Sequence, residues 1–142
     1  MSVLVYTESE QGKFKKNAFE VASYASAVAK MMGTTVTAIA FNTTEGDSLG
    51  EYGVSKVLNV KDSSLETFNA GGFAASIAEA VKSTDAKVVI LSSSTDTKYL
   101  APLLSAKLSA GYAPNVVQAP DSTSPFMVKE PLSVIKVLHT LK

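Results

Sequence analysis

The sequence predicts one α/β domain, a three-layer α/β/α, Rossmann-like sandwich built on a mostly parallel sheet. Its 142 residues suit a single domain with a substantial hydrophobic core. Apolar runs of strand type alternate with segments of helical period, and the connections between them are short. This alternation is typical of a parallel sheet with right-handed crossovers. In such a sheet, ligands usually sit outside the carboxyl ends of the strands, where the strand order reverses.

The first half of the chain contains three predicted strands and one long helix. Val3–Tyr6 is a short apolar run of strand type. Apolar residues then recur at mostly three- and four-residue spacings from Asn17 onward, which predicts a helix, and Gly33 stands where that helix would end. Thr35–Phe41 is the second predicted strand, and a turn-rich stretch leads to the third, Lys56–Val60.

The second half repeats this pattern around a more apolar strand. Ala70–Gly72 is interpreted as a loop, after which Phe73 begins a helix with an apolar stripe at i, i+4, i+7 and i+8. Lys87–Leu91 is apolar on both faces, as expected for a strand at the centre of a sheet that helices cover on either side. A predicted helix over Tyr99–Leu108 places its leucines on one side, and Ala113–Ala119 offers a fifth strand.

The composition excludes several classes of function. Thirteen basic side chains balance thirteen acidic ones, so there is no electrostatic footprint for nucleic acid or an anionic membrane. The basic cluster Lys13–Lys16 is interpreted as a solvated approach to the first helix. The lack of cysteine excludes a disulfide framework, a thiolate metal site and a cysteine nucleophile. With neither a signal-peptide pattern nor an apolar run of the ~20 residues that span a membrane, we expect a cytoplasmic protein without membrane insertion.

Two polar turns would face the crevice of such a sheet, Thr7–Glu10 after the first strand and Ser92–Thr95 after the fourth. The crevice candidates at the second turn are Ser93, Thr95, Asp96 and Lys98. Backbone N–H groups and hydroxyls at a helix start would cradle a phosphate, but the charge of Asp96 and the lack of glycine in this turn oppose one. We favour the interpretation that Thr95, Asp96 or Thr97 caps the helix and satisfies its free N–H groups.

No catalytic constellation is visible in the sequence. The carboxylates of Glu8 and Glu10 would suit acid–base work, but alternation in an exposed loop would point them in different directions, so both are interpreted as solvated. His139 is the only histidine, which leaves no material for a catalytic triad or a histidine-rich metal site. We therefore expect this chain to supply no catalytic, metal-binding or cofactor-binding residue and to have no enzymatic activity of its own.

Three stretches of the chain carry a family resemblance, and together they cover roughly residues 3–128. Residues 3–41, which begin VLVYTESEQGKF, match an opening strand, an E…G-K loop, a long helix and a second strand. YGVSKVLNV resembles a G-A-x-K-V strand signature, and KVVILSSSTDTKYLAPLLSAKL resembles a strand with a T-x-x-x-x-L-A-P-x-L-A-x-x-L helix. In these features the chain resembles the N-terminal domain of the electron transfer flavoprotein α subunit. Thr97–Tyr99 in place of Gly-Arg-Asp, and Leu103 in place of arginine, depart from the family pattern and put polar contacts of that helix in doubt.

This resemblance implies an electron carrier with an adenine nucleotide alpha hydrolase-like fold. Such proteins are heterodimers of α and β subunits. They take electrons from flavin dehydrogenases, such as the acyl-CoA dehydrogenases of fatty acid β-oxidation, and pass them to a quinone reductase or another acceptor. The full-length family holds FAD mainly in the C-terminal domain of α, with help from β, while the related domain of β holds AMP. The N-terminal domain of α is mainly scaffold and subunit interface, so this chain alone is not expected to bind FAD.

The end of the chain departs from the family. The family usually continues with Arg-Gly-Ala-Phe where this chain reads EPLSVIKVLHTLK, so we predict the α-subunit domain over residues 1–129 and an atypical tail over residues 130–142. With suitable codons, the neighbouring reading frame of the last nine residues spells a family-like continuation. We therefore hypothesise that a frameshift removed the C-terminal FAD domain. A tail of that origin was not selected to pack, and we expect it to be disordered or loosely attached.

Two other functions stay open. A universal-stress-type nucleotide-binding module shares this sheet architecture, but its G-x2-G-x9-G-[ST] loop is missing after Leu91. A purely structural or self-associating domain is the third possibility, because loss of a second domain would expose surface made to be covered.

Overall fold

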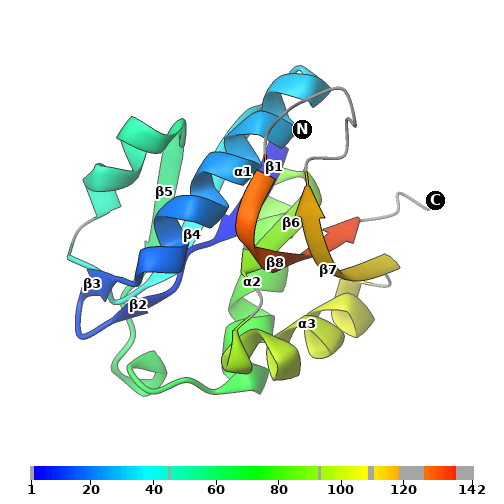
Figure 1. Cartoon of the computed structure of the whole chain (residues 1–142). Helices are drawn as coiled ribbons and strands as arrows, with labels where there is room; N and C mark the ends of the chain where they lie inside the picture. The colour runs from blue at the N-terminus through cyan, green and yellow to red at the C-terminus, as the bar shows by residue number, and fades with distance from the viewer. Residues whose placement is uncertain (1, 45, 93, 109–110, 119–126, 137–142) are drawn as a thin grey trace.

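The computed structural model describes residues 2–44, 46–92, 94–108, 111–118 and 127–136, which form a six-stranded sheet with helices on both faces (Figure 1). The strands of the sheet are β1 (Ser2–Tyr6), β4 (Thr35–Phe41), β5 (Lys56–Val60), β6 (Ala86–Ser92), β7 (Gly111–Gln118) and β8 (Met127–Lys136). The helices are α1 (Lys16–Met32), α2 (Ala70–Thr84) and α3 (Thr95–Leu108), with two short 3-10 turns, η1 (Gly46–Tyr52) and η2 (Ser63–Leu65). Outside the sheet, β2 (Ser9–Glu10) and β3 (Lys13–Phe14) form a small hairpin. No helix in these ranges is long and apolar enough to cross a membrane.

The strand order confirms the predicted α/β architecture. The sheet runs β5-β4-β1-β6-β8-β7, and β5, β4, β1 and β6 are parallel to one another. From β1 the chain adds β4 and then β5 on one side. The helix α2 then connects β5 to β6, which lies on the other side of β1. The direction of strand addition therefore reverses between β1 and β6, and the carboxyl ends of these two strands are where a crevice is expected.

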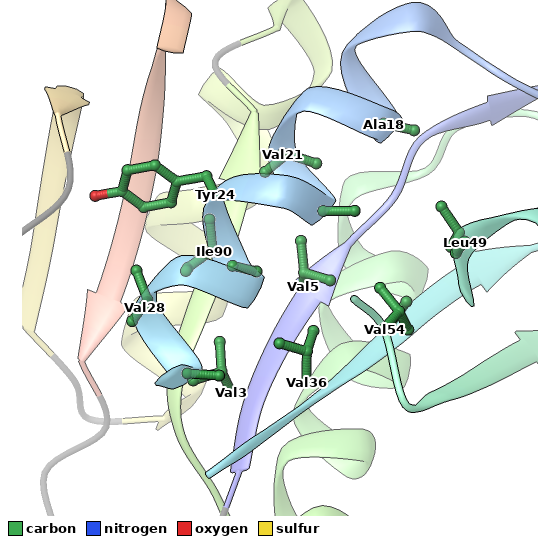
Figure 2. Close-up of a cluster of buried hydrophobic side chains, with 14 of the residues drawn as sticks. Val3, Val5, Ala18, Val21, Tyr24, Val28, Val36, Leu49, Val54 and Ile90 are labelled. Carbon is green, nitrogen blue, oxygen red and sulfur yellow. The ribbon is translucent and has the colours of Figure 1, made fainter. Parts of the chain in front are cut away.

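The core consists of two apolar layers, one on each side of the sheet, because β1 alternates between them. Val3 and Val5 pack in the layer under α1, and Figure 2 shows them among residues of that helix and of neighbouring strands. Leu4 and Tyr6 point the other way and pack in the layer under α2 and α3. All four side chains are buried, and full burial of such a side chain stabilises a fold by roughly 1.5–3 kcal/mol. A strand buried on both faces belongs at the centre of a sheet, which is where β1 lies.

Most predicted boundaries agree with the structure, but the starts of α2 and α3 do not. α3 begins at Thr95, so the predicted start at Tyr99 is wrong by four residues. The second and third predicted strands coincide with β4 and β5, and α1 ends at Gly33 as expected. However, α2 begins at Ala70, so the interpretation of Ala70–Gly72 as a loop is wrong. The reason is Asn69, whose Oδ1 accepts a hydrogen bond of 3.1 Å from the Gly72 N–H. This cap starts the helix three residues before its first large apolar side chain.

The last two strands form an antiparallel addition to the sheet. The predicted fifth strand is β7, whereas β8 was not predicted from the sequence. β8 pairs antiparallel with both β6 and β7, with Ile90 opposite Val134. The expectation of a loosely attached tail is therefore wrong for residues 130–136, while residues 137–142 lie outside the described residues. Branched side chains in the tail favour a strand, and β8 covers an edge of β6 that would otherwise be unpaired. The domain boundary at residue 129 stays a prediction.

Candidate functional site

The carboxyl ends of β1 and β6 bring a glutamate and a serine together. The two strands are in parallel register, with Tyr6 opposite Leu91. The chain then leaves β1 through Thr7 and Glu8, while β6 ends at Ser92. The Ser92 hydroxyl donates a hydrogen bond to Oε2 of Glu8, and the Glu8 side chain is only 2% exposed. A buried carboxylate thus sits at the point where the strand order reverses.

A tight hairpin returns the chain to this carboxylate and supplies its other partners. Gln11 and Gly12 both have positive φ values, 53° and 86°, as the two-residue turn between β2 and β3 requires. The chain comes back so that the Lys15 N–H donates to the Glu8 carbonyl at 2.9 Å. The Lys15 Nζ then lies 3.3 Å from Oε1 of Glu8. At the start of α1, the Asn17 amide donates to Oε2 of Glu8 at 3.3 Å and to Oγ of Ser92 at 3.1 Å.

These contacts place the Glu8 carboxylate at the N-terminus of α1. The first turn of this helix has no acidic residue, and the N-cap Lys15 makes no side-chain cap. The free N–H groups of a helix start attract negative charge, and here Glu8 supplies it by binding the side chains of Lys15 and Asn17. The same helix ends bind phosphate in nucleotide-binding folds. A phosphate approaching the N-terminus of α1 would therefore be repelled by the buried Glu8 carboxylate.

The second polar turn starts α3, and its capping differs from the prediction. α3 begins at Thr95, so Thr95, Asp96 and Thr97 lie inside the helix and none of them is its N-cap. Ser94 precedes the helix, and its Oγ accepts a hydrogen bond from the Thr97 N–H at 3.2 Å. In return, Oγ1 of Thr97 accepts from the Ser94 N–H at 2.7 Å. This reciprocal pair is a capping box, which sequence reasoning placed one to three residues too late.

The crevice candidates from the sequence occupy different positions. Asp96 lies in the first turn of α3 and lines a cavity next to Glu8. Lys98 is exposed and does not line that cavity. Thr95 is the first residue of α3, and Ser93 lies outside the described residues.

In the polar turn after β1, one of the two glutamates is solvated as predicted and the other is not. Glu10 is exposed, whereas the interpretation of Glu8 as solvated is wrong. The hairpin turns the chain sharply after Glu8, so this segment is not the extended exposed loop that the alternation argument assumed. The solvated approach predicted for Lys13–Lys16 holds for Lys13 and Lys16, which are exposed. Lys15 differs because it pairs with Glu8 and is 37% exposed.

A cavity of about 320 Å³ opens beside the carboxylate network. It combines aromatic rings with several acidic side chains and a single lysine. The charged and aromatic residues of its lining are Tyr6, Glu8, Glu10, Lys15, Phe41, Glu66, Phe68, Phe73 and Asp96. Burial raises the pKa of the Tyr6 hydroxyl above its usual range, and the nearby carboxylates of Glu8 and Asp96 raise it further. Tyr6 is therefore a neutral phenol near pH 7.

The residues of this crevice do not fit the phosphates of a flavin or adenine nucleotide. The Glu8 carboxylate contacts the Lys15 and Asn17 side chains at the start of α1. Asp96 lies in the first turn of α3, and the acidic side chains of the cavity outnumber its one lysine. Within the described ranges, no group of three or more His, Cys, Asp or Glu side chains is arranged to hold a metal ion.

The comparison with known families adds one finding. The model of the electron transfer flavoprotein domain family matches residues 3–142. That range includes every helix of the fold, both polar turns and the cavity. No curated protein matches the chain significantly.

Proposed function

The chain belongs to the electron transfer flavoprotein domain family, and we propose that it serves as the N-terminal domain of an α subunit. In this role it is a scaffold of an electron carrier, and the redox centre is bound elsewhere in the assembled protein. The observation that carries the proposal is the Glu8 network. It places a buried, paired carboxylate at the switch point between β1 and β6, where sheets of this kind usually bind their ligand.

The choice of an α subunit rests on β6 and α3. These elements contain the stretch that resembles the α-subunit signature, with Leu100, Ala101 and Pro102 as its Leu-Ala-Pro segment. Leu100 and Leu104 are fully buried in the apolar layer shared with α2. The signature residues therefore hold the fold together, which suits a scaffold role. By contrast, Leu103, which replaces the family's arginine, is 45% exposed.

The cofactor assignment follows from the charges of the crevice. The related β-subunit domain holds AMP, whereas the acidic lining here would repel a phosphate. We infer that FAD is bound by other parts of the heterodimer, and that electrons pass from flavin dehydrogenases to a quinone reductase or another acceptor without a group of this domain taking part. A cytoplasmic location belongs to the same proposal.

Association with a β subunit is the direct test of this role. The chain is co-expressed with an electron transfer flavoprotein β subunit, and the mixture is resolved by size-exclusion chromatography with light scattering. We expect a complex with one copy of each chain. Failure of the two chains to associate at micromolar concentration would contradict the scaffold role.

A nucleotide-binding module of the universal-stress type is distinguished by a thermal titration with ATP. A ligand at about 100 times its dissociation constant adds about 2.7 kcal/mol to the free energy of unfolding. We expect no ATP-dependent rise in the melting temperature, because the Glu8 carboxylate occupies the start of α1. A saturable rise would favour the nucleotide-binding function instead.

A further inference from the structure

The cavity beside Glu8 has a rigid aromatic wall. It lies at the carboxyl ends of β1 and β4, which contribute Tyr6 and Phe41, and the start of α2 contributes Phe73. The rings of Phe41 and Phe73 are stacked with centroids 4.0 Å apart. Tyr6 meets both of them edge-on, at 5.9 and 6.2 Å. Each ring is thus held by the other two, so the wall is preformed rather than assembled by a ligand.

The hydroxyl of Tyr6 gives this wall a polar end that is not hydrogen-bonded to any described residue. Tyr6 is 4% exposed and lines the cavity. No hydrogen bond to its hydroxyl comes from any residue in the described ranges, although the carboxylates of Glu8 and Asp96 act on it electrostatically. A phenol hydroxyl can both donate and accept a hydrogen bond. At the wall of a cavity, this hydroxyl is available to bind a ligand.

The charges of the cavity lining indicate that a ligand of this cavity would be positively charged. Lys15 is paired with Glu8, so it does not neutralise the other acids. No ion pair to Glu10, Glu66 or Asp96 is present among the described residues. Three carboxylates that have no cationic partner in the described part of the chain therefore line a cavity with an aromatic wall. Aromatic faces and carboxylates both attract cations and disfavour anions.

We propose that this cavity binds a small organic cation, with a primary ammonium group between the Tyr6 hydroxyl and the Asp96 carboxylate. The ammonium group has three N–H donors and no acceptor, which suits a phenol oxygen and a carboxylate that receive no hydrogen bond from the described residues. The apolar body of the ligand packs against Phe41 and Phe73. A cavity of about 320 Å³ lies at the lower end of the range for small-molecule sites. The proposal is independent of the flavin assignment, because it concerns a different ligand with the opposite charge.

Three probes of nearly equal shape separate charge from apolar packing. Phenethylammonium, 2-phenylethanol and phenylacetate are each titrated into the purified chain by isothermal calorimetry at low salt. We expect phenethylammonium to bind at least about tenfold more tightly than the neutral alcohol, with an affinity that falls as salt rises. Phenylacetate is expected not to bind. Equal affinities for the cation and the alcohol, or no heat from the cation up to about 10 mM, would overturn the proposal.

Point variants locate the site within the cavity. Tyr6→Phe removes the hydroxyl and keeps the ring, and we expect about fivefold weaker binding of phenethylammonium. Asp96→Asn removes the charge, and we expect about tenfold weaker binding. Glu79→Gln on the exposed face of α2, outside the cavity, is the matched control and should bind like wild type. Circular dichroism and melting curves verify that each variant is folded. If Asp96→Asn and Glu79→Gln bind equally, the ammonium group is not at Asp96 and the proposal is wrong.

Discussion

The ion pair between Lys15 and Glu8 offers the sharpest test of the crevice geometry. Lys15→Met keeps the aliphatic stem of the lysine and removes its charge, which leaves the Glu8 carboxylate buried with only the neutral donors of Asn17 and Ser92. Glu8→Gln keeps the shape of the glutamate and removes the opposite charge. The double variant removes both charges, so a double-mutant cycle isolates the interaction between the two side chains.

The expected magnitude follows from the distance and the exposure of the pair. At 3.3 Å, two unit charges attract by roughly 5 kcal/mol at an effective dielectric constant of 20 and by roughly 1.3 kcal/mol in bulk water. Glu8 is 2% exposed, but Lys15 is 37% exposed, so solvent screens the pair in part. We therefore expect each single variant to lower the free energy of unfolding by about 2 kcal/mol, and the coupling energy to be about 2 kcal/mol.

Urea and thermal unfolding of the four proteins measure this coupling. A loss of 2 kcal/mol corresponds to roughly 7 °C in melting temperature for a domain of this size. Glu10 and Lys13 are the matched control pair, because they face each other across the same hairpin and are both exposed. Their coupling should stay below about 0.5 kcal/mol. If the Lys15 and Glu8 variants were as additive as the control pair, the carboxylate would not be held in the crevice and the reasoning would fail.

Three further predictions address other parts of the fold. The pKa of Tyr6 is raised in the folded chain, so above pH 10 the unfolded chain releases a proton that the folded chain retains. The stability of wild type should therefore fall faster with pH than that of Tyr6→Phe. Alkaline denaturation curves should show a difference of up to about 1.4 kcal/mol per pH unit. Gly53 has φ +89°, and a methyl group there would collide with Oγ of Ser26, so Gly53→Ala should lower the stability by more than about 1 kcal/mol. The control Gly50→Ala places its methyl group in open space and should change the stability by less than about 0.5 kcal/mol. Similar melting temperatures for the two variants would refute the geometry. Ser94→Ala removes the cap of α3 and should cost about 1 kcal/mol in urea unfolding, and an unchanged midpoint would contradict the capping box.

The sheet was predictable because its signals are local. β4 and β5 are apolar runs bounded by turn residues, and their limits were read from the sequence without error. Helix starts were harder, since they depend on which polar residue bonds to which N–H. Both Ser94 and Thr97 are residues that cap helices well, and only the hydrogen bonds of the folded chain distinguish Ser94 as the cap.

The candidate site was less predictable because it is assembled from distant segments. The partners of Glu8 are seven, nine and 84 residues away in sequence. Strict alternation assigned this side chain to solvent, and only the return of the chain through the hairpin shows that it is buried. β8 was missed for a different reason. The tail was judged by its departure from the family pattern, whereas strand formation responds to branched side chains and to an available edge.

A titration of the purified chain with FAD, followed by the quenching of flavin fluorescence, tests most directly whether the crevice is closed to nucleotides. We predict no saturable quenching, because the Glu8 carboxylate occupies the start of α1 and the cavity beside it is acidic. Binding of one equivalent of FAD by this chain alone, with the backbone amide signals of Glu8 and Ser92 shifted in NMR spectra, would contradict the assignment of the redox centre to another part of the carrier.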